Sequence, residues 1–150
     1  MTRESFAALQ PVFQPLVDQL KAKAPASDLP ECKGVYLLSE NGVDLYVGIT
    51  GNLRRRWRMH RNGDTSGASF AVRLAREKAG RHRTYRQSDG LKALLNDASF
   101  GQAFATAQAR IREMEVRFIE WTRDDDDLAL FEIYAASALH TGAYNDFATH

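Results

Sequence analysis

Apolar residues recur at roughly helical intervals over residues 1–25, which predicts an α-helix in the first part of the sequence. Pro11 and Pro15 fall inside this stretch. Because proline donates no backbone hydrogen bond and clashes with the preceding turn, we expect a break or kink near these two residues. A loop over residues 24–30 separates this helix from the next element.

The middle of the chain predicts a β-hairpin followed by helices. Two short apolar segments, residues 34–39 and 43–48, flank the turn-forming sequence Glu-Asn-Gly. An arginine-rich helix is expected over residues 53–61, and further helices are expected near 68–79 and 90–109.

The hairpin turn admits two registers. If residues 41–42 form a two-residue type I′ turn, Tyr36 faces Val47 and lies on the opposite face of the sheet from Tyr46. If residues 40–42 form a three-residue loop, Tyr36 faces Tyr46 directly and the two phenols share one face. The residue pattern leaves both registers open.

The last part of the chain predicts a strand and a helix. Apolar and charged residues alternate over residues 111–121, as in a half-buried strand. The acidic run 124–127 favours a helix start, because carboxylates interact well with the positive end of the helix dipole. We expect this helix to run to about His140 and to be ended by Gly142.

Composition narrows the class of protein. The 150 residues suit a single domain, and 44% of them are hydrophobic, which is enough for a core. No stretch approaches the ~18 apolar residues of a membrane span, and the first residues do not resemble an export signal. The single cysteine, Cys32, excludes an intramolecular disulfide. We therefore expect a cytoplasmic protein without membrane association.

Charge is distributed unevenly along the chain. The segment from Gly51 to Lys92 carries twelve Lys or Arg and only three Asp or Glu, although the whole chain has a net charge of +1. Such a polarised molecule can bind a polyanion with one face. Guanidinium groups suit phosphate oxygens, although a solvated arginine-rich surface would give the same pattern. Arg56 and His60 are four residues apart and project from the same side of the expected helix.

Glu132 is the only charged residue between Leu128 and Leu139. A buried carboxylate is costly unless it is paired or binds a cation, so Glu132 is a candidate ligand for a hard metal ion. The alternative is an exposed glutamate selected for the helix dipole. Tyr36 and Tyr46 are candidate proton carriers, although strand tyrosines are usually packing residues and a free phenol has a pKa near 10.

The order of these features resembles the GIY-YIG nucleases. Gly34-Val35-Tyr36 and Tyr46-Val47-Gly48 resemble the two motifs that name the family, with valine where the name has isoleucine. The next segment, residues 50–60, resembles the family's arginine-bearing helix. The terminal pair Tyr144-Asn145 resembles the family's last motif. The resemblance extends over residues 32–147 and implies that the two tyrosines share one site, which favours the three-residue loop.

The resemblance implies an α/β (α+β) fold. In this fold, helices flank a three-stranded antiparallel sheet made of the hairpin and residues near 112–120. Residues 1–30 would form an N-terminal helical extension, and residues 31–150 would form the nuclease domain. A helical insertion is expected at about 63–109.

The implied activity is metal-dependent endonuclease cleavage of DNA with one divalent cation, Mg²⁺ or Mn²⁺, held by Glu132. The resemblance implies that Tyr36 is the base, with His60 as the competing proton acceptor because its ordinary pKa suits neutral pH. Arg56 would stabilise charge on the phosphoryl oxygens. Tyr46 and Asn145 would position the phosphate, the water or other side chains.

The implied substrate is duplex or single-stranded DNA. The residues expected to contact it are Arg54, Arg55, Arg58, Arg61, Arg73 and Arg76. The alternatives are a nuclease acting on single-stranded DNA or RNA, and a catalytically silent or partner-dependent nucleic-acid-binding module. Since the sequence shows no separate targeting domain, a homodimer or a partner protein is expected to supply tight sequence specificity.

Overall fold

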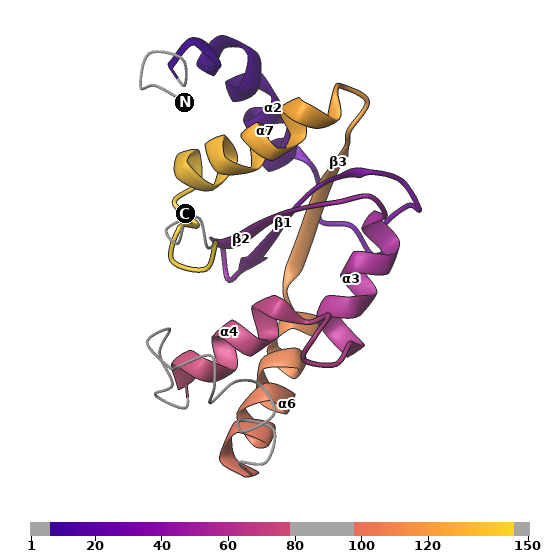
Figure 1. Cartoon of the computed structure of the whole chain (residues 1–150), viewed down its shortest axis with the longest axis vertical. Coiled ribbons are helices and arrows are strands. Elements are labelled where there is room, and N and C mark those ends of the chain that lie inside the picture. Colours follow the sequence, from indigo (N-terminus) through magenta and orange to yellow (C-terminus); the bar gives the residue numbers. More distant parts are fainter. Residues whose placement is uncertain (1–6, 79–97, 146–150) are drawn as a thin grey trace. The chain divides into compact units, whose positions relative to one another are not determined.

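The computed structural model describes residues 7–78 and 98–145, which form two compact units (Figure 1). The first unit comprises the chain up to Arg54 and again from Glu115 onward. The second unit is Arg55–Met114. Within the described ranges, no helix is long and apolar enough to cross a membrane. The expected division into an extension over 1–30, a domain over 31–150 and an insertion over 63–109 stays a prediction.

The first unit is built on a three-stranded antiparallel sheet. Its strands are β1 (Gly34–Glu40), β2 (Val43–Thr50) and β3 (Glu115–Glu120), in the order β2-β1-β3. β1 is the central strand, and its side chains are buried as far as Ser39. β2 and β3 are the edge strands. The predicted three-stranded sheet and α/β fold class are confirmed.

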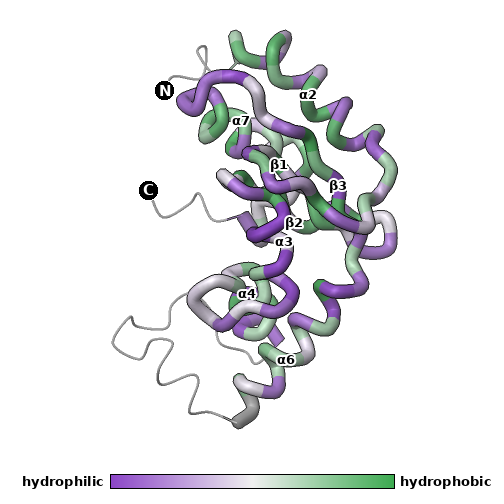
Figure 2. Tube along the Cα trace, turned by 90° about the vertical axis from the view of Figure 1, so that its right-hand side faces the viewer, coloured by the Kyte–Doolittle hydropathy of each residue, from purple (hydrophilic) through white to green (hydrophobic). Residues whose placement is uncertain are grey.

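Two helices pack on one face of this sheet. They are α2 (Gln10–Ala22) and α7 (Asp125–Ala138), and both carry the hydrophobic stretches visible in Figure 2. The Phe13 ring of α2 meets the Phe131 ring of α7 edge to face, with centroids 5.4 Å apart. Val35, Leu37 and Val47 meet these rings from the sheet side of the same core. The opposite face of the sheet carries Tyr36, Leu38 and Tyr46.

The second unit contains three described helices. α3 (Leu53–Asn62) starts in the first unit, and its residues from Arg55 belong to the second; α4 is Ser69–Lys78 and α6 is Ala98–Arg112. α4 and α6 pack against each other, with Phe70 and Phe100 fully buried. Trp57 of α3 is buried as well. The helices predicted over 53–61 and 68–79 are confirmed.

The hairpin differs from the expected register. Asn41 (φ 52°) and Gly42 (φ 80°) are both left-handed, which defines a two-residue type I′ turn. The pairing then shifts by one residue, so that Leu38 faces Tyr46 and Leu45 is the extra residue of a β-bulge. The three-residue loop is therefore wrong. The Asn-Gly pair forms the turn it favours, and the bulge changes the register beyond it.

The bulge nevertheless places both tyrosines on one face. Tyr36 pairs with Gly48 instead of Tyr46. Since Tyr46 lies two residues before Gly48, the two phenols are diagonal neighbours on the same side of the sheet. The shared face is confirmed, and the direct pairing is not.

The two prolines of the first helix behave differently. Leu9 is a turn residue between helical segments, and Pro11 lies in the first turn of α2, where a missing amide hydrogen costs nothing. The predicted interruption is therefore found there. Pro15 lies inside α2 without ending it. Pro11 and Pro15 are both exposed, so water can satisfy the carbonyl that Pro15 leaves without an amide donor.

The predicted strand over 111–121 starts later than expected. α6 continues to Arg112, and β3 begins at Glu115. Ile111 and Met114 are both buried, and their spacing of three suits a helix end as well as a strand. The first residues of the helix expected at 90–109 lie outside the described residues.

α7 ends before the expected position. Its last turn is closed by His140, which has a left-handed backbone (φ 58°) and donates its amide to Ser137 O. The Thr141 amide donates to Ala136 O, which completes a Schellman motif. Gly142 therefore does not end the helix, and a histidine stands where glycine is usually favoured.

Replacing His140 by glycine is expected to stabilise the fold. A left-handed backbone strains any residue with a Cβ, so His140→Gly should raise the free energy of unfolding by about 0.5–1 kcal/mol in urea denaturation. Gly142→Ala is the control, because a Cβ at Gly142 meets nothing within 4 Å. If His140→Gly left the free energy of unfolding unchanged or lowered it, the assignment of the helix end to His140 would be wrong.

Candidate functional site

The ring of Tyr36 lies directly over Gly48. A Cβ built on Gly48 would stand 2.1 Å from the Tyr36 Cζ and 2.2 Å from its Oη. No side chain fits there, so the glycine opposite Tyr36 is a steric requirement of this ring position. The sequence pattern placed Gly48 in a motif but gave it no role. Its signal was its place in the strand that pairs with Tyr36.

Tyr46 lies beside Tyr36 on the same face. The two ring centroids are 6.2 Å apart with an interplanar angle of 38°. Tyr36 is buried, and Tyr46 is partly exposed. The sheet therefore holds two phenols next to each other, one enclosed and one reachable by solvent.

The side chain of Asn145 bonds the outer edge of β2. Its Oδ1 accepts the Val47 amide hydrogen at 3.0 Å, and its Nδ2 donates to the Val47 carbonyl at 2.5 Å. Asn145 thus acts as a one-residue strand partner for an edge strand. Val47 lies between Tyr46 and Gly48, so this pair of bonds fixes the backbone that carries both positions. This geometry favours a positioning role for Asn145.

Thr141 holds the Asn145 amide in place. Its buried hydroxyl donates to Asn145 Oδ1 at 2.7 Å, and its carbonyl accepts the Asn145 amide hydrogen at 2.9 Å. Sequence reasoning did not single out Thr141. A hydroxyl residue four positions before the motif asparagine is the only signal the sequence carried.

Glu132 lies near the middle of α7, and it is half-buried. It is not in the first turn, so the alternative of an exposed glutamate placed for the dipole does not describe it. α7 packs against β2, the strand of Tyr46 and Gly48. Phe131 and Ala135, on the core side of α7, are fully buried, whereas Ile133 is 41% exposed.

As a metal ligand, Glu132 would suit only a cation that takes few protein ligands. In residues 7–78 and 98–145, no group of three or more His, Cys, Asp or Glu side chains could hold a metal ion. Mg²⁺ commonly binds through one or two carboxylates and completes its shell with water and substrate phosphate. One half-buried carboxylate on a rigid helix is compatible with that mode of binding, and it would not suit a structural zinc site.

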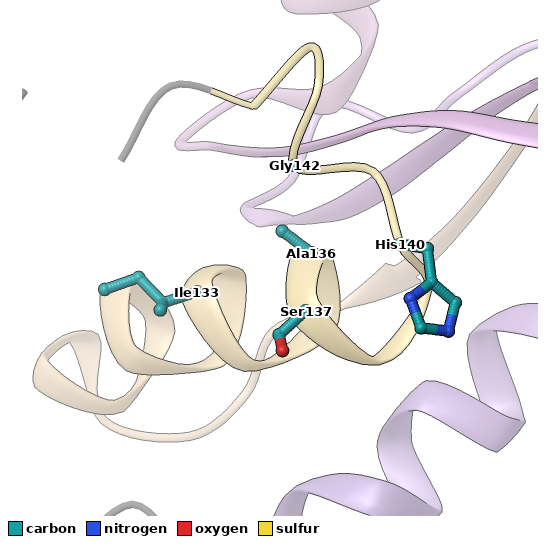
Figure 3. A pocket seen from close by; sticks show the side chains of 5 residues that line it. All are labelled: Ile133, Ala136, Ser137, His140 and Gly142. Atoms are coloured by element: carbon teal, nitrogen blue, oxygen red, sulfur yellow. The ribbon is translucent and has the colours of Figure 1, made fainter. Parts of the chain in front are cut away.

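A groove of about 450 Å³ follows the outer side of α7 (Figure 3). Its lining residues are Ile133, Ala136, Ser137, His140 and Gly142. Ala136 is one helical turn after Glu132. The groove therefore runs along the same helix as the candidate metal ligand.

Arg56 and His60 belong to the second unit. The Arg56 guanidinium donates to the Gly67 carbonyl at 3.5 Å and to Ser69 Oγ at 3.3 Å, which ties α3 to the start of α4. His60 is buried, and its ring meets Phe70 edge to face with centroids 6.4 Å apart. The two predicted neighbours are thus on the same side of α3.

Burial changes the chemistry of His60. Desolvation, and then the positive charge of Arg56, lower the pKa of His60 to about 3. The imidazole is neutral at physiological pH and is a weak base. The sequence argument for His60 as a proton acceptor rested on its ordinary pKa, and that argument no longer holds.

The arginines expected to bind nucleic acid have different surroundings. Arg54 Nε donates to the Leu29 carbonyl at 2.9 Å, and its guanidinium lies 3.6 Å from Asp28, so Arg54 anchors the segment before β1. Arg55 and Arg58 are exposed. Two of the six arginines expected to contact nucleic acid therefore lie at the exposed surface of α3.

The other three predicted arginines are partly buried. Arg61 stacks on the Trp57 ring at 4.9 Å and donates Nε to the Trp57 carbonyl at 3.3 Å. Arg73 and Arg76 are half-buried on α4. The structure thus brings Tyr36, Tyr46, Glu132 and Asn145 into one unit and Arg56 and His60 into the other.

Gly48→Ala should displace the Tyr36 ring and destabilise the fold. The added Cβ would overlap the Tyr36 ring, so we expect the free energy of unfolding to fall by about 1–3 kcal/mol and the Tyr36 ring signals to shift in NMR spectra. Gly51→Ala is the matched control, because a Cβ there meets nothing within 4 Å. Equal losses of stability in the two variants would contradict the steric role of Gly48.

The lowered pKa of His60 has a consequence for stability. Between pH 6.5 and about 3, the unfolded chain binds a proton that folded His60 does not. Stability is therefore complete above pH 6.5 and falls on acidification, by up to about 1.4 kcal/mol per pH unit. His60→Gln should flatten this slope in urea titrations between pH 7 and 5. An unchanged slope in the His60→Gln variant would contradict this consequence of burying the imidazole.

Comparison with known proteins agrees with this arrangement. Residues 32–145 match the family model of the GIY-YIG catalytic domain. No curated protein sequence and no solved structure matched the chain. The matched range begins just before β1 and ends at Asn145, so it contains both tyrosines, the arginine-rich helix, Glu132 and the terminal asparagine. The chain belongs to the GIY-YIG nuclease family.

Proposed function

We propose that the protein is a metal-dependent endonuclease that hydrolyses phosphodiester bonds in DNA. The observation that carries the proposal is the pair of Tyr36 and Tyr46 on one sheet face, with Gly48 beneath one ring and Asn145 fixing the strand between them. A structural tyrosine pair would not need this arrangement. A site that must hold a phenol oxygen in one position would.

In the proposed reaction, a water oxygen attacks phosphorus and the bond to the 3′ oxygen breaks. Tyr36, ionised as the phenolate, takes the proton of the attacking water, and the departing oxygen takes a proton from solvent; the phenol then loses its proton to solvent before the next turnover. His60, with its pKa near 3, serves as a neutral hydrogen-bonding group and leaves the role of base to Tyr36. Arg56 neutralises charge that builds on the phosphoryl oxygens.

Glu132 is the residue proposed to hold one Mg²⁺ or Mn²⁺ ion. When bound, such an ion supplies Lewis-acid stabilisation of the phosphoryl and leaving oxygens. The contribution of this chain is a carboxylate on a helix that packs against β2. Tyr46 orients the phosphate or the water, and Asn145 keeps β2 in register.

Cleavage of end-labelled DNA tests the proposal. The full chain should cut duplex or single-stranded DNA with Mg²⁺ or Mn²⁺ and not with EDTA. Glu132→Gln should lower the rate about 100-fold or more, because it removes the charge that attracts the cation. Glu113→Gln, at an exposed glutamate near the end of α6, is the matched control and should leave the rate unchanged.

Other outcomes would lead to other functions. Equal rates in the Glu132 and Glu113 variants would contradict the role of Glu132. Binding of DNA without cleavage under every metal condition would favour the silent binding module. Cleavage of RNA with none of DNA would change the substrate class.

A further inference from the structure

The exposed side of α3 is lined by polar residues at helical spacing. Arg55, Arg58 and Asn62 are exposed and stand at positions i, i+3 and i+7. Trp57 and His60 are buried on the other side of the helix. The exposed side therefore presents two guanidinium groups and an amide in one row.

A residue of α6 extends this row. Arg112 Nε donates to Asn62 Oδ1 at 3.3 Å. Arg112 is fifty residues away in the sequence, and it lies outside the arginine-rich segment that the charge pattern singled out. We call the row formed by Arg55, Arg58, Asn62 and Arg112 the α3–α6 strip.

Acidic groups of the described chain do not neutralise two of the three arginines in the strip. In the described ranges, neither Arg58 nor Arg112 forms a salt bridge. Asp64 follows α3, but its Oδ1 accepts hydrogen bonds from the Ser66 hydroxyl and the Ser66 and Gly67 amides. Its carboxylate stabilises its own loop. The positive charge of Arg58 and Arg112 can thus act on an external anion.

The dimensions suit a polynucleotide backbone. From Arg55 to Asn62 the helix rises about 10 Å. One DNA strand advances about 3.4 Å along the axis per phosphate, so a row of this length can meet more than one phosphate of the same strand. Guanidinium groups bind phosphate oxygens through paired N–H donors. The Asn62 side chain accepts a hydrogen bond from Arg112 through Oδ1, so its Nδ2 can donate to a further phosphate oxygen.

We infer that the α3–α6 strip binds the phosphodiester backbone of the nucleic-acid substrate, with Arg112 as a contact residue that Asn62 positions. The inference deepens the proposed nuclease function and rests on it for the identity of the polyanion. The contacts are to phosphates, so they add affinity and register without reading sequence. Arg54 and Arg61 do not take part, because the Leu29 carbonyl and the Trp57 ring engage them.

The test measures binding separately from cleavage. The full chain carrying Glu132→Gln, in EDTA, is titrated with fluorescent duplex and single-stranded DNA at several salt concentrations. In that background, Arg58→Gln and Arg112→Gln should each weaken binding and reduce the slope of log affinity against log salt, by about 0.9 on duplex or about 0.7 on single strands. Arg123→Gln removes an exposed arginine in the first unit and should change neither quantity.

A double-mutant cycle tests the positioning role of Asn62. Asn62→Ala should weaken binding when Arg112 is present and have a much smaller effect in the Arg112→Gln background. Equal effects in both backgrounds would overturn the role given to Asn62. Salt slopes for the Arg58→Gln/Arg112→Gln double variant that equal those of the Arg123→Gln control would overturn the strip itself.

The two proposals fail in different ways. Cleavage that depends on Glu132, together with unchanged binding by the Arg58 and Arg112 variants, would remove the strip and leave the nuclease. Weakened binding by these variants in a chain that never cleaves DNA would remove the nuclease proposal and support the strip as a binding surface. Circular dichroism of each variant checks that the helices remain folded.

Discussion

The two hydrogen bonds between the Asn145 amide and the Val47 backbone hold the edge strand on which the candidate site depends. β2 has a bulge at Leu45 and has β1 on one side only, so its register beyond the bulge needs a second support. A slip of one residue would turn every side chain of β2 to the other face. Gly48 would then no longer lie under Tyr36. Asn145, in the last motif of the chain, therefore maintains the position of Tyr36 relative to Gly48, which belong to the first two motifs.

The spacing of hydrophobic residues was sufficient to predict most helices and strands. It was insufficient to predict the register in which β1 pairs with β2. The sheet strands and helices follow from alternating and helical spacings, because these patterns reflect which side chains must be buried. The Asn-Gly pair made a type I′ turn one of two open alternatives, because both residues tolerate a positive φ. The bulge at Leu45 was not, since one extra residue in a strand depends on how Tyr36, Leu38 and Tyr46 pack across the sheet. The family resemblance predicted the shared face of the tyrosines correctly and assigned the wrong loop to it.

The sequence allowed the residues of the candidate site to be predicted. It did not allow their hydrogen-bond partners, burial or pKa values to be predicted. Asn145 and Val47 are 98 residues apart, and no local pattern indicates that their polar groups meet. The pKa of His60 depends on burial and on Arg56, so an ordinary imidazole pKa was a poor guide to its role. Arg54 and Arg58 look equivalent in the sequence. In the part of the chain that the structure describes, Arg54 has a carbonyl and a carboxylate within reach and Arg58 does not.

These environments connect the choice of base with the need for a cation. In the proposed reaction, His60 is neutral and weakly basic, so a phenol takes the role of base, and the ordinary pKa of a phenol is near 10. A phenol acts as a base near neutral pH only when a nearby positive charge favours its ionised form or acidifies the water. Glu132, on the helix that packs against β2, is the residue that we propose to hold such a charge. In the proposed mechanism, a weakly basic His60 thus makes the cation more important to the residue that acts as base.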